Sequence, residues 1–111
     1  MSYDGIIHVA VGVVINRQQE ILISQRHIDS HQGSLWEFPG GKVEPMETPE
    51  IALIRELKEE IGIDTWSSCL APLTFASHSY EDFHLLMPVF LEIPLRMAYQ
   101  EWTGPLGISQ I

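Results

Sequence analysis

The stretch that most constrains this chain is residues 41–63, where a glycine-rich turn leads into a short helix dense in carboxylates. Thr48, Pro49 and Glu50 predict the helix start, because threonine caps free amides, proline fits the first helical position and an acid suits the positive end of the dipole. Gly62 predicts its end. At about 100° per residue, several apolar side chains share a face that we expect to meet the core: Leu53, Ile54, Leu57 and Ile61.

A second face of this helix carries Glu56, Glu59 and Glu60 at positions i, i+3 and i+4. Like charges at these spacings repel, and only Arg55 and Lys58 lie close enough in sequence to compensate. Three converging carboxylates suit a hard divalent cation such as Mg²⁺, which prefers oxygen ligands. The alternative, for this short run alone, is a solvated acidic face.

The wider spacing resembles a known signature. Gly41, Glu47 six positions later, and the run Arg55-Glu56-Leu57-x-Glu59-Glu60-x-Gly62-Ile63 fill every specified position of the Nudix box. The chain therefore resembles the Nudix hydrolases, which cleave nucleoside diphosphates linked to another group. The preceding residues 36–44, WEFPGGKVE, resemble the MutT branch of that family, which hydrolyses oxidised nucleotides. Met46 stands where that branch usually has glycine, which predicts a local change of turn.

The resemblance implies a set of roles for the acidic helix. Metal ions, Mg²⁺ or alternatively Mn²⁺, would be held by side chains of the helix and by a glycine carbonyl: Glu56, Glu59, Glu60, and Gly40 or Gly41. Glu56 or Glu59 would act as the base. Arg55 would orient a glutamate without touching substrate, and Glu47 would support the loop geometry.

The resemblance also implies a nucleotide pocket. Residues 20–26 alternate like a strand, and Arg26 at its end and His31 five residues later match nucleotide contacts of the MutT branch; the alternative is a surface arginine and a loop histidine. The segment that turns the chain would line the pocket, with Phe38 read mainly as a core residue that also touches the pocket: Glu37, Phe38, Pro39 and Gly40. Phe83 would contact the base, on a looser alignment.

The net charge of the chain limits which binding partners are expected. The net charge is −9, and eight of the fifteen acidic residues lie between Glu37 and Asp64. Such a surface argues against binding a nucleic-acid polymer, whereas metal ions would neutralise it and then hold the phosphates of a nucleoside triphosphate. No stretch is apolar enough to span a membrane, and no secretory signal is evident. Cys69, the single cysteine, fits a buried position and a cytoplasmic protein.

The other elements follow from alternation and turn residues. We expect strands at 6–15 and 20–26 joined as a hairpin, a short strand at 36–38, and a turn at 39–41. A second hairpin should join 72–80 to 83–93, with Pro88 at a bulge or an edge. One α+β domain over residues 1–111 with a mixed sheet follows, and the resemblance specifies the Nudix α/β/α sandwich.

The tail is where the resemblance weakens. It is good for residues 6–91, but Ser109 stands near the position of a family glutamate, and we expect the chain to stop before a further strand and before the helix that covers the sheet. We expect a tail that is truncated or divergent, with or without that C-terminal helix. A missing helix would expose apolar sheet surface, which favours dimerisation or instability, so we expect either a monomer or a homodimer.

These observations predict a Mg²⁺-dependent nucleoside triphosphate pyrophosphohydrolase. The MutT-like segment suggests conversion of 8-oxo-dGTP to 8-oxo-dGMP and pyrophosphate, that is, sanitation of the nucleotide pool in the service of DNA repair. The alternatives are hydrolysis of (d)CTP or another nucleoside triphosphate, or a catalytically impaired Nudix module that only binds a nucleotide.

Overall fold

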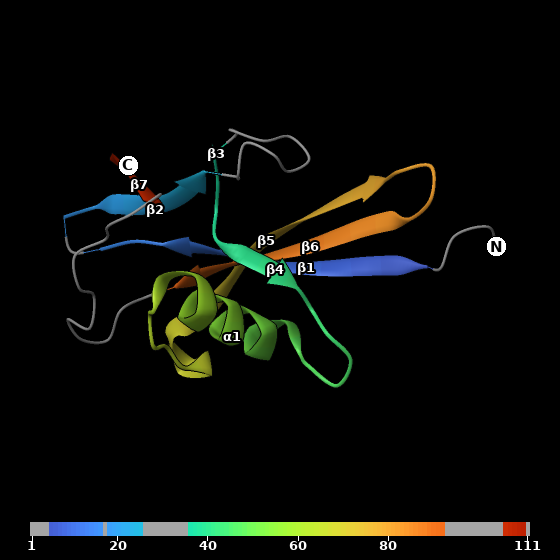
Figure 1. Cartoon of the computed structure of the whole chain (residues 1–111), viewed down its shortest axis with the longest axis horizontal. Helices are drawn as coiled ribbons and strands as arrows, with labels where there is room; N and C mark the ends of the chain where they lie inside the picture. The colour runs from blue at the N-terminus through green and yellow to red at the C-terminus, as the bar shows by residue number, and fades with distance from the viewer. Residues whose placement is uncertain (1–4, 17, 26–35, 93–105, 111) are drawn as a thin grey trace.

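The computed structural model describes residues 5–16, 18–25, 36–92 and 106–110 (Figure 1). The elements in chain order are β1 (Ile6–Val14), β2 (Glu20–Gln25), β3 (Trp36–Glu37), β4 (Gly40–Lys42), α1 (Pro49–Ile61), the 3-10 turn η1 (Ser67–Cys69), β5 (Leu70–Ser79), β6 (His84–Glu92) and β7 (Leu106–Gln110). Arg26 and His31, two predicted nucleotide contacts, lie outside the described residues.

The strands form two sheets. One has the order β4-β1-β6-β5, with β1 and β6 parallel and the other neighbours antiparallel; the second has the order β3-β2-β7 and is antiparallel. Figure 1 shows α1 beside the first sheet, where it packs against β1 and β4. The predicted α+β class with a mixed sheet is therefore confirmed.

The predicted hairpin between the first two strands is wrong beyond its base. Only the single bridge between Ile15 and Ile21 joins them, and β2 then continues in the other sheet. β1 pairs with β4 at Val9–Val11 on one side and with β6 along the other, which leaves little of its length for β2. Alternating residues predicted the strands but not their partners.

The predicted turn at 39–41 is confirmed only at Pro39, where the chain bends from one sheet into the other, because Gly40 and Gly41 lie in β4 and pair with β1. Gly40 has a φ of 153°, and a Cβ built on it would lie 2.1 Å from the carbonyl oxygen of Ala10. Glycine is needed here for a close approach of two strands rather than for a reversal of the chain.

The helix follows its sequence signals. The side chain of Thr48 accepts a hydrogen bond from the Ile51 amide at 3.2 Å, Pro49 is the first helical residue, and Gly62 ends the helix with a φ of 70°. The predicted apolar stripe is confirmed, since Leu53 and Leu57 are fully buried. Ile54 and Ile61 are partly buried against the same core, which also includes Leu22 of the second sheet and Phe90 of β6.

Pro88 lies inside β6, an internal strand, rather than at an edge. The parallel register pairs His8 with Leu86 and Val11 with Val89, so it is interrupted at Met87 and Pro88. That interruption coincides with a residue that has no amide hydrogen to donate. The hairpin of β5 and β6 was predicted correctly, and the irregularity in their pairing falls in β5, between Pro72 and Thr74.

The expectation that the chain ends before a further strand is wrong. Residues 106–110 form β7, which pairs antiparallel with β2 from Leu106 opposite Ser24 to Gln110 opposite Glu20. Among the described residues, no helix is long and apolar enough to cross a membrane. Cys69 is buried with 3% exposure, as predicted.

The last residue of β6, Glu92, is a buried acid. Glu92 is 2% exposed, and the hydroxyl of Thr65, itself 7% exposed, donates to its Oε2 at 2.6 Å. Burial raises the pKa of Glu92, an effect that the hydrogen bond from Thr65 opposes. The ionised form is therefore held at a cost in the folded state, because a buried carboxylate loses its hydration.

Replacing this acid should change how stability depends on pH. A raised folded pKa means that the unfolded chain releases the proton first as pH rises, so stability falls between the unfolded and folded pKa values. Glu92→Gln removes that loss and keeps an acceptor for Thr65. We expect the variant to gain stability relative to the parent as pH rises from 4 upward, a range set by the ordinary glutamate pKa of about 4.3. Urea unfolding at several pH values measures this, and parallel pH curves for the two proteins would contradict it.

Candidate active site

The loop before the helix is built on a tight turn. The amide of Glu47 donates to the carbonyl of Glu44 at 3.0 Å, with Pro45 and Met46 between them. Met46 has a φ of 70° and is fully exposed. This is the geometry of a type II turn, which requires a positive φ at its third residue. Met46 therefore occupies a left-handed conformation that glycine adopts most readily, and the predicted change of turn relative to the MutT branch stays a prediction.

Met46→Gly should therefore stabilise the protein. A left-handed conformation costs a side-chain-bearing residue about 1–2 kcal/mol, part of which glycine returns as extra chain entropy when unfolded. We expect a gain of up to about 1 kcal/mol. Met46→Ala is the matched control, since it keeps Cβ and removes only the exposed thioether. Equal midpoints of thermal unfolding for the two variants would show that the turn stores no strain.

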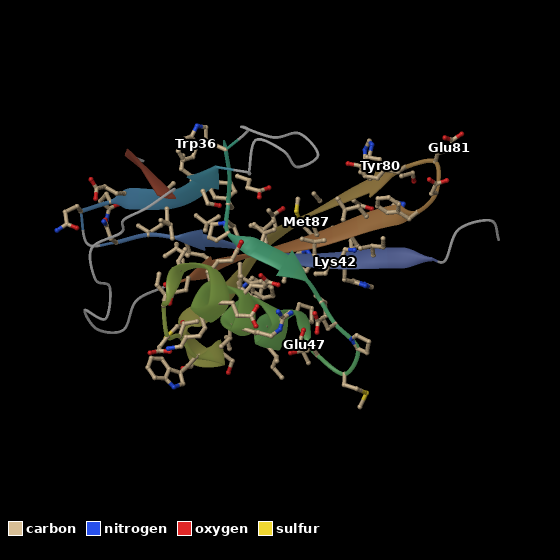
Figure 2. All side chains as sticks on the ribbon, in the orientation of Figure 1. Trp36, Lys42, Glu47, Tyr80, Glu81 and Met87 are labelled. Carbon is tan, nitrogen blue, oxygen red and sulfur yellow. The ribbon has the colours of Figure 1, made fainter. Side chains whose placement is uncertain are left out.

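Arg55 joins this loop to the helix. Its Nε donates to Glu47 Oε2 at 2.7 Å and its Nη2 to Glu47 Oε1 at 3.0 Å, a bidentate ion pair, while Nη2 also donates to the carbonyl of Lys42 at 3.1 Å. These bonds, with a further one from the Glu44 amide, lower the pKa of Glu47 to about 2. Hydrogen bonding to Glu47 in turn raises the pKa of Arg55. Figure 2 shows Lys42 on β4 and Glu47 on the loop below it, the two elements that Arg55 connects.

The same guanidinium reaches two carboxylates of α1. Its Nη1 donates to Glu56 Oε2 at 3.0 Å and to Glu59 Oε1 at 3.4 Å. Glu56 lies against the backbone of β4, where a Cβ on Gly41 would come within 2.3 Å of its carboxylate. Because Gly41 has no side chain, the Glu56 carboxylate has room beside β4. The hydrogen bond from Arg55 fixes the direction of that carboxylate.

Glu60 is anchored separately. Its Oε1 accepts a hydrogen bond from the amide of Gly40 at 3.1 Å. Loss of hydration raises the pKa of Glu60, the bond from Gly40 opposes this, and repulsion from three other carboxylates adds to the rise: Glu56, Glu37 and Glu59. The carboxylates of α1 thus form an acidic region beside β4 that Arg55 neutralises only in part.

This donor set fits a divalent cation by its chemistry. All the candidate side-chain ligands are carboxylates, and hard cations such as Mg²⁺ prefer oxygen. Within the described part of the chain, no three His, Cys, Asp or Glu side chains already stand in a group that could hold a metal ion. Arg55 instead pairs with Glu56 and Glu59, so the three glutamates of the helix would have to turn toward a shared ion.

The pocket residues are only partly brought together. Trp36 is 51% and Phe38 42% exposed, so the interpretation of Phe38 as a core residue is wrong. Pro39 is buried, and its carbonyl accepts from the amide of Gly12 at 2.9 Å, which ties the segment to β1. Glu37 is exposed in β3 beside Trp36. Exposed aromatic side chains next to β4 are available for stacking on a base.

Phe83 lies apart from these residues. It stacks on Tyr80 with ring centroids 4.9 Å apart, at the turn between β5 and β6. In Figure 2 Tyr80 and Glu81 stand at one end of the molecule and Trp36 toward the other. The sequence also missed two backbone contacts of the site, the carbonyl of Lys42 and the amide of Gly40, because main-chain groups leave no signal in residue type.

Comparison with known proteins finds similar sequences and similar folds. The family model described as "NUDIX domain" matches residues 6–103. The chain is 47% identical over 105 residues to the 8-oxo-dGTP diphosphatase of Proteus vulgaris, covering 95% of this chain and 92% of that protein. It is also 54% identical over 54 residues to the CTP pyrophosphohydrolase of Escherichia coli strain K12, covering 49% of this chain and 40% of that protein.

The fold has solved counterparts as well. The crystal structure of a MutT NUDIX hydrolase from Burkholderia pseudomallei matches with a TM-score of 0.73 and 26% identity, over 94% of this chain and 82% of that one. The family match extends past residue 91, so the resemblance reaches further into the tail than the sequence alone suggested. The family model matches most of the chain, and a relative of 47% identity matches nearly all of it. This chain therefore belongs to the Nudix hydrolases.

Proposed function

We propose that this protein is a nucleoside triphosphate pyrophosphohydrolase that converts 8-oxo-dGTP to 8-oxo-dGMP and pyrophosphate. The observation that carries the proposal is the linked set of Arg55, Glu56, Glu59 and Glu60 beside β4, tied to Glu47 and to the Gly40 amide. This chain is also 47% identical to a protein named 8-oxo-dGTP diphosphatase, over nearly the whole length of both, and that identity supports 8-oxo-dGTP as the substrate.

Nudix hydrolases generally use divalent metals, and Mg²⁺ is the ion that we propose here, with Mn²⁺ as an alternative. The residues that would hold it are Glu56, Glu59, Glu60 and the carbonyl of Gly40. A bound ion would lower the pKa of a water molecule and neutralise charge on the phosphoryl oxygens. Without it, the negative charge beside β4 would repel a polyphosphate.

The side chains of α1 and of the loop before it would have separate roles in the reaction. Glu56 or Glu59 accepts the proton of the attacking water. Arg55 is a positioning residue, because its contacts run to Glu47, Glu56, Glu59 and Lys42 within the protein itself. Glu47, with a pKa near 2, stays ionised and keeps the guanidinium in place across the physiological range of pH.

The nucleoside would lie along β3 and β4. Phe38 has an exposed ring, and its sequence neighbours Glu37, Pro39 and Gly40 would line the nucleoside site with it. Arg26 and His31 remain proposed contacts to the phosphates or the base, and Phe83 a proposed contact to the base. We further propose that the enzyme acts in the cytoplasm, where its single cysteine would stay reduced, and there serves DNA repair by cleaning the nucleotide pool.

A second candidate substrate is CTP or dCTP. It is favoured by the 54% identity, over about half of this chain, to a protein named CTP pyrophosphohydrolase. A third reading is a module that binds nucleotide without cleaving it, which is motivated by the altered tail, where Ser109 stands near the position of a family glutamate.

The test is product analysis. The purified chain is incubated with 8-oxo-dGTP, dGTP or dCTP, each with Mg²⁺, with Mn²⁺ and with EDTA, and the products are separated. Monophosphate and pyrophosphate that appear only with metal, and fastest from 8-oxo-dGTP, are the expected result. Faster release from dCTP would move the proposal to the second candidate. A cooperatively folded protein that is stabilised by metal and nucleotide but releases no product would be a binding module.

A further inference from the structure

Two serines and a histidine outside the candidate active site lie together on one face of the four-stranded sheet. Ser77 and Ser79 are alternate residues of β5, and Ser79 pairs across the strands with His84 of β6 (Figure 1). Alternate residues of a strand point to the same face, and so do residues that are directly opposite each other on neighbouring strands. Both hydroxyls therefore lie on the face of the sheet that carries the ring of His84.

Both ring nitrogens of His84 are hydrogen-bonded to these hydroxyls. The Oγ of Ser77 lies 2.5 Å from Nε2, and the Oγ of Ser79 lies 2.8 Å from Nδ1. A neutral imidazole has one donor and one acceptor nitrogen, so one serine donates to the ring while the other accepts from it. Hydroxyl donors reach about 2.5 Å whereas N–H donors stop at about 2.7 Å, so we assign Ser77 as the donor and Ser79 as the acceptor.

This arrangement has the geometry of an activated nucleophile. A serine hydroxyl becomes reactive when a base stands in position to take its proton and a third group holds the base in its orientation. Here Nε2 of His84 faces the proton of Ser77, and Ser79 holds the ring through Nδ1. Ser79 is thus a positioning residue. Surface serines and histidines often bond to each other and do nothing more, but two further features distinguish this group.

The first feature is a backbone amide beside the hydroxyl. The amide of Tyr80 donates to the carbonyl of Phe83 at 2.8 Å, so these two residues form a hydrogen-bonded pair at the turn. Such pairs alternate with non-hydrogen-bonded pairs along an antiparallel ladder, and Ser77, three residues before Tyr80 and opposite Leu86, belongs to the second kind. Its amide therefore points away from β6, toward an edge where no strand in the described part of the chain receives it. An amide in this position is a donor for the oxyanion that forms during acyl transfer.

The second feature is the apolar surface around the hydroxyl. Leu86 lies opposite Ser77, Ile6 of β1 lies opposite His84, and Phe75 precedes Ser77 by two residues on the same face. Phe75 is 65% and Ile6 51% exposed. Residues 65–80 contain no Asp, Glu, Lys or Arg. An uncharged substrate with an apolar acyl or aryl group would therefore find contacts here, whereas β5 has no cation to hold a phosphate.

We propose that Ser77 is a nucleophile that takes an acyl group from activated esters, such as the aryl esters of carboxylic acids. Its Oγ forms a bond to the carbonyl carbon, its proton passes to Nε2 of His84, and the oxyanion accepts a hydrogen bond from the Ser77 amide. The bond from the carbonyl carbon to the ester oxygen then breaks, and the proton on Nε2 leaves with the phenol. The acyl group stays on Ser77 as an ester. This reaction is independent of the proposed nucleotide substrate and of any metal.

The test is acetylation of the purified chain by p-nitrophenyl acetate in EDTA, so that no metal-bound water contributes. Absorbance follows the release of p-nitrophenolate, and mass spectrometry of peptides from the acid-quenched protein locates the acetyl group. We expect a single stable acetyl group on Ser77. His84→Gln keeps a hydrogen-bonding side chain but provides no base, so it should slow acetylation of Ser77 by about 100-fold.

Further variants separate this chemistry from effects on the fold. Ser79→Ala should slow acetylation, and Ser79→Thr, which keeps the hydroxyl, should restore most of the rate. His78→Gln is the matched control, because His78 points to the opposite face of β5 and its loss should leave the rate unchanged. Ser77→Ala should lose the acetyl group and keep both the cooperative thermal transition and nucleotide hydrolysis. A parent protein without a stable acetyl group on Ser77, or equal rates for the parent and His84→Gln, would overturn the inference.

Discussion

Glu59→Gln and Glu60→Gln should each lower the turnover of nucleoside triphosphate by at least about a hundredfold, which is the upper range for losing a group one step removed from a metal. Glutamine keeps the size and shape of the side chain but carries no negative charge to hold a divalent ion. Initial rates are measured across a series of Mg²⁺ concentrations. Part of the loss should be recovered at high Mg²⁺ if the lost carboxylate binds the ion.

Stability separates this effect from damage to the fold. The pKa of Glu60 is raised by lost hydration and by neighbouring carboxylates, so its ionised form is disfavoured in the folded protein. Glu60→Gln should therefore unfold at the same temperature as the parent or higher, the pattern expected when a site is built at the expense of stability. Glu81→Gln, at the exposed turn between β5 and β6, is the control and should keep full activity. If Glu59→Gln and Glu60→Gln both kept full activity, the assignment of these two residues as metal ligands would be wrong.

Arg55→Lys should lower turnover by about 10- to 100-fold, although the charge is retained. Lysine cannot reproduce the paired bonds from Nε and Nη2 to Glu47 while also reaching Glu56 and the carbonyl of Lys42. The carboxylate of Glu56 then loses its fixed direction. Steady-state rates should show a fall in kcat that exceeds any change in KM for the nucleotide.

Two readouts test whether Arg55 acts through Glu47. The pKa of Glu47 is depressed to about 2, so its ion pair stabilises the fold above the ordinary glutamate pKa and is lost as pH falls toward 2. Arg55→Lys should move acid unfolding to higher pH. In addition, the double variant of Arg55→Lys with Glu47→Gln should be no slower than the worse single variant. Additive losses would show that the two residues act separately.

Local signals predicted the helix and its chemistry. Thr48, Pro49 and Gly62 fixed its ends because capping and left-handed termination depend on neighbours within a turn. The face with Glu56, Glu59 and Glu60 followed from helical spacing alone. Alternation, a local property, also located β1, β2, β3, β5 and β6 within a few residues, but β4 and β7 were not predicted.

Partners across the sheet were not predictable in the same way. β2 leaves β1 after a single bridge and pairs with β3 and β7 in the other sheet, and alternation along the chain does not encode that choice. The exposure of Phe38 and the contact between Gly40 and Glu60 depend in the same manner on which strand lies next to β4. Such pairings join residues far apart in sequence, and a one-dimensional pattern does not record them.

The sequence by itself thus determined the acidic helix, the loop glutamate that precedes it and the glycines that come before both. Only the tertiary structure decided what these residues touch: that Gly41 leaves room for the Glu56 carboxylate, that Arg55 ties Glu47, Glu56 and the Lys42 carbonyl together, and that β5 is left at an open edge. Spacing along one helix is set by its own geometry, whereas these contacts exist only after separate segments have paired and packed.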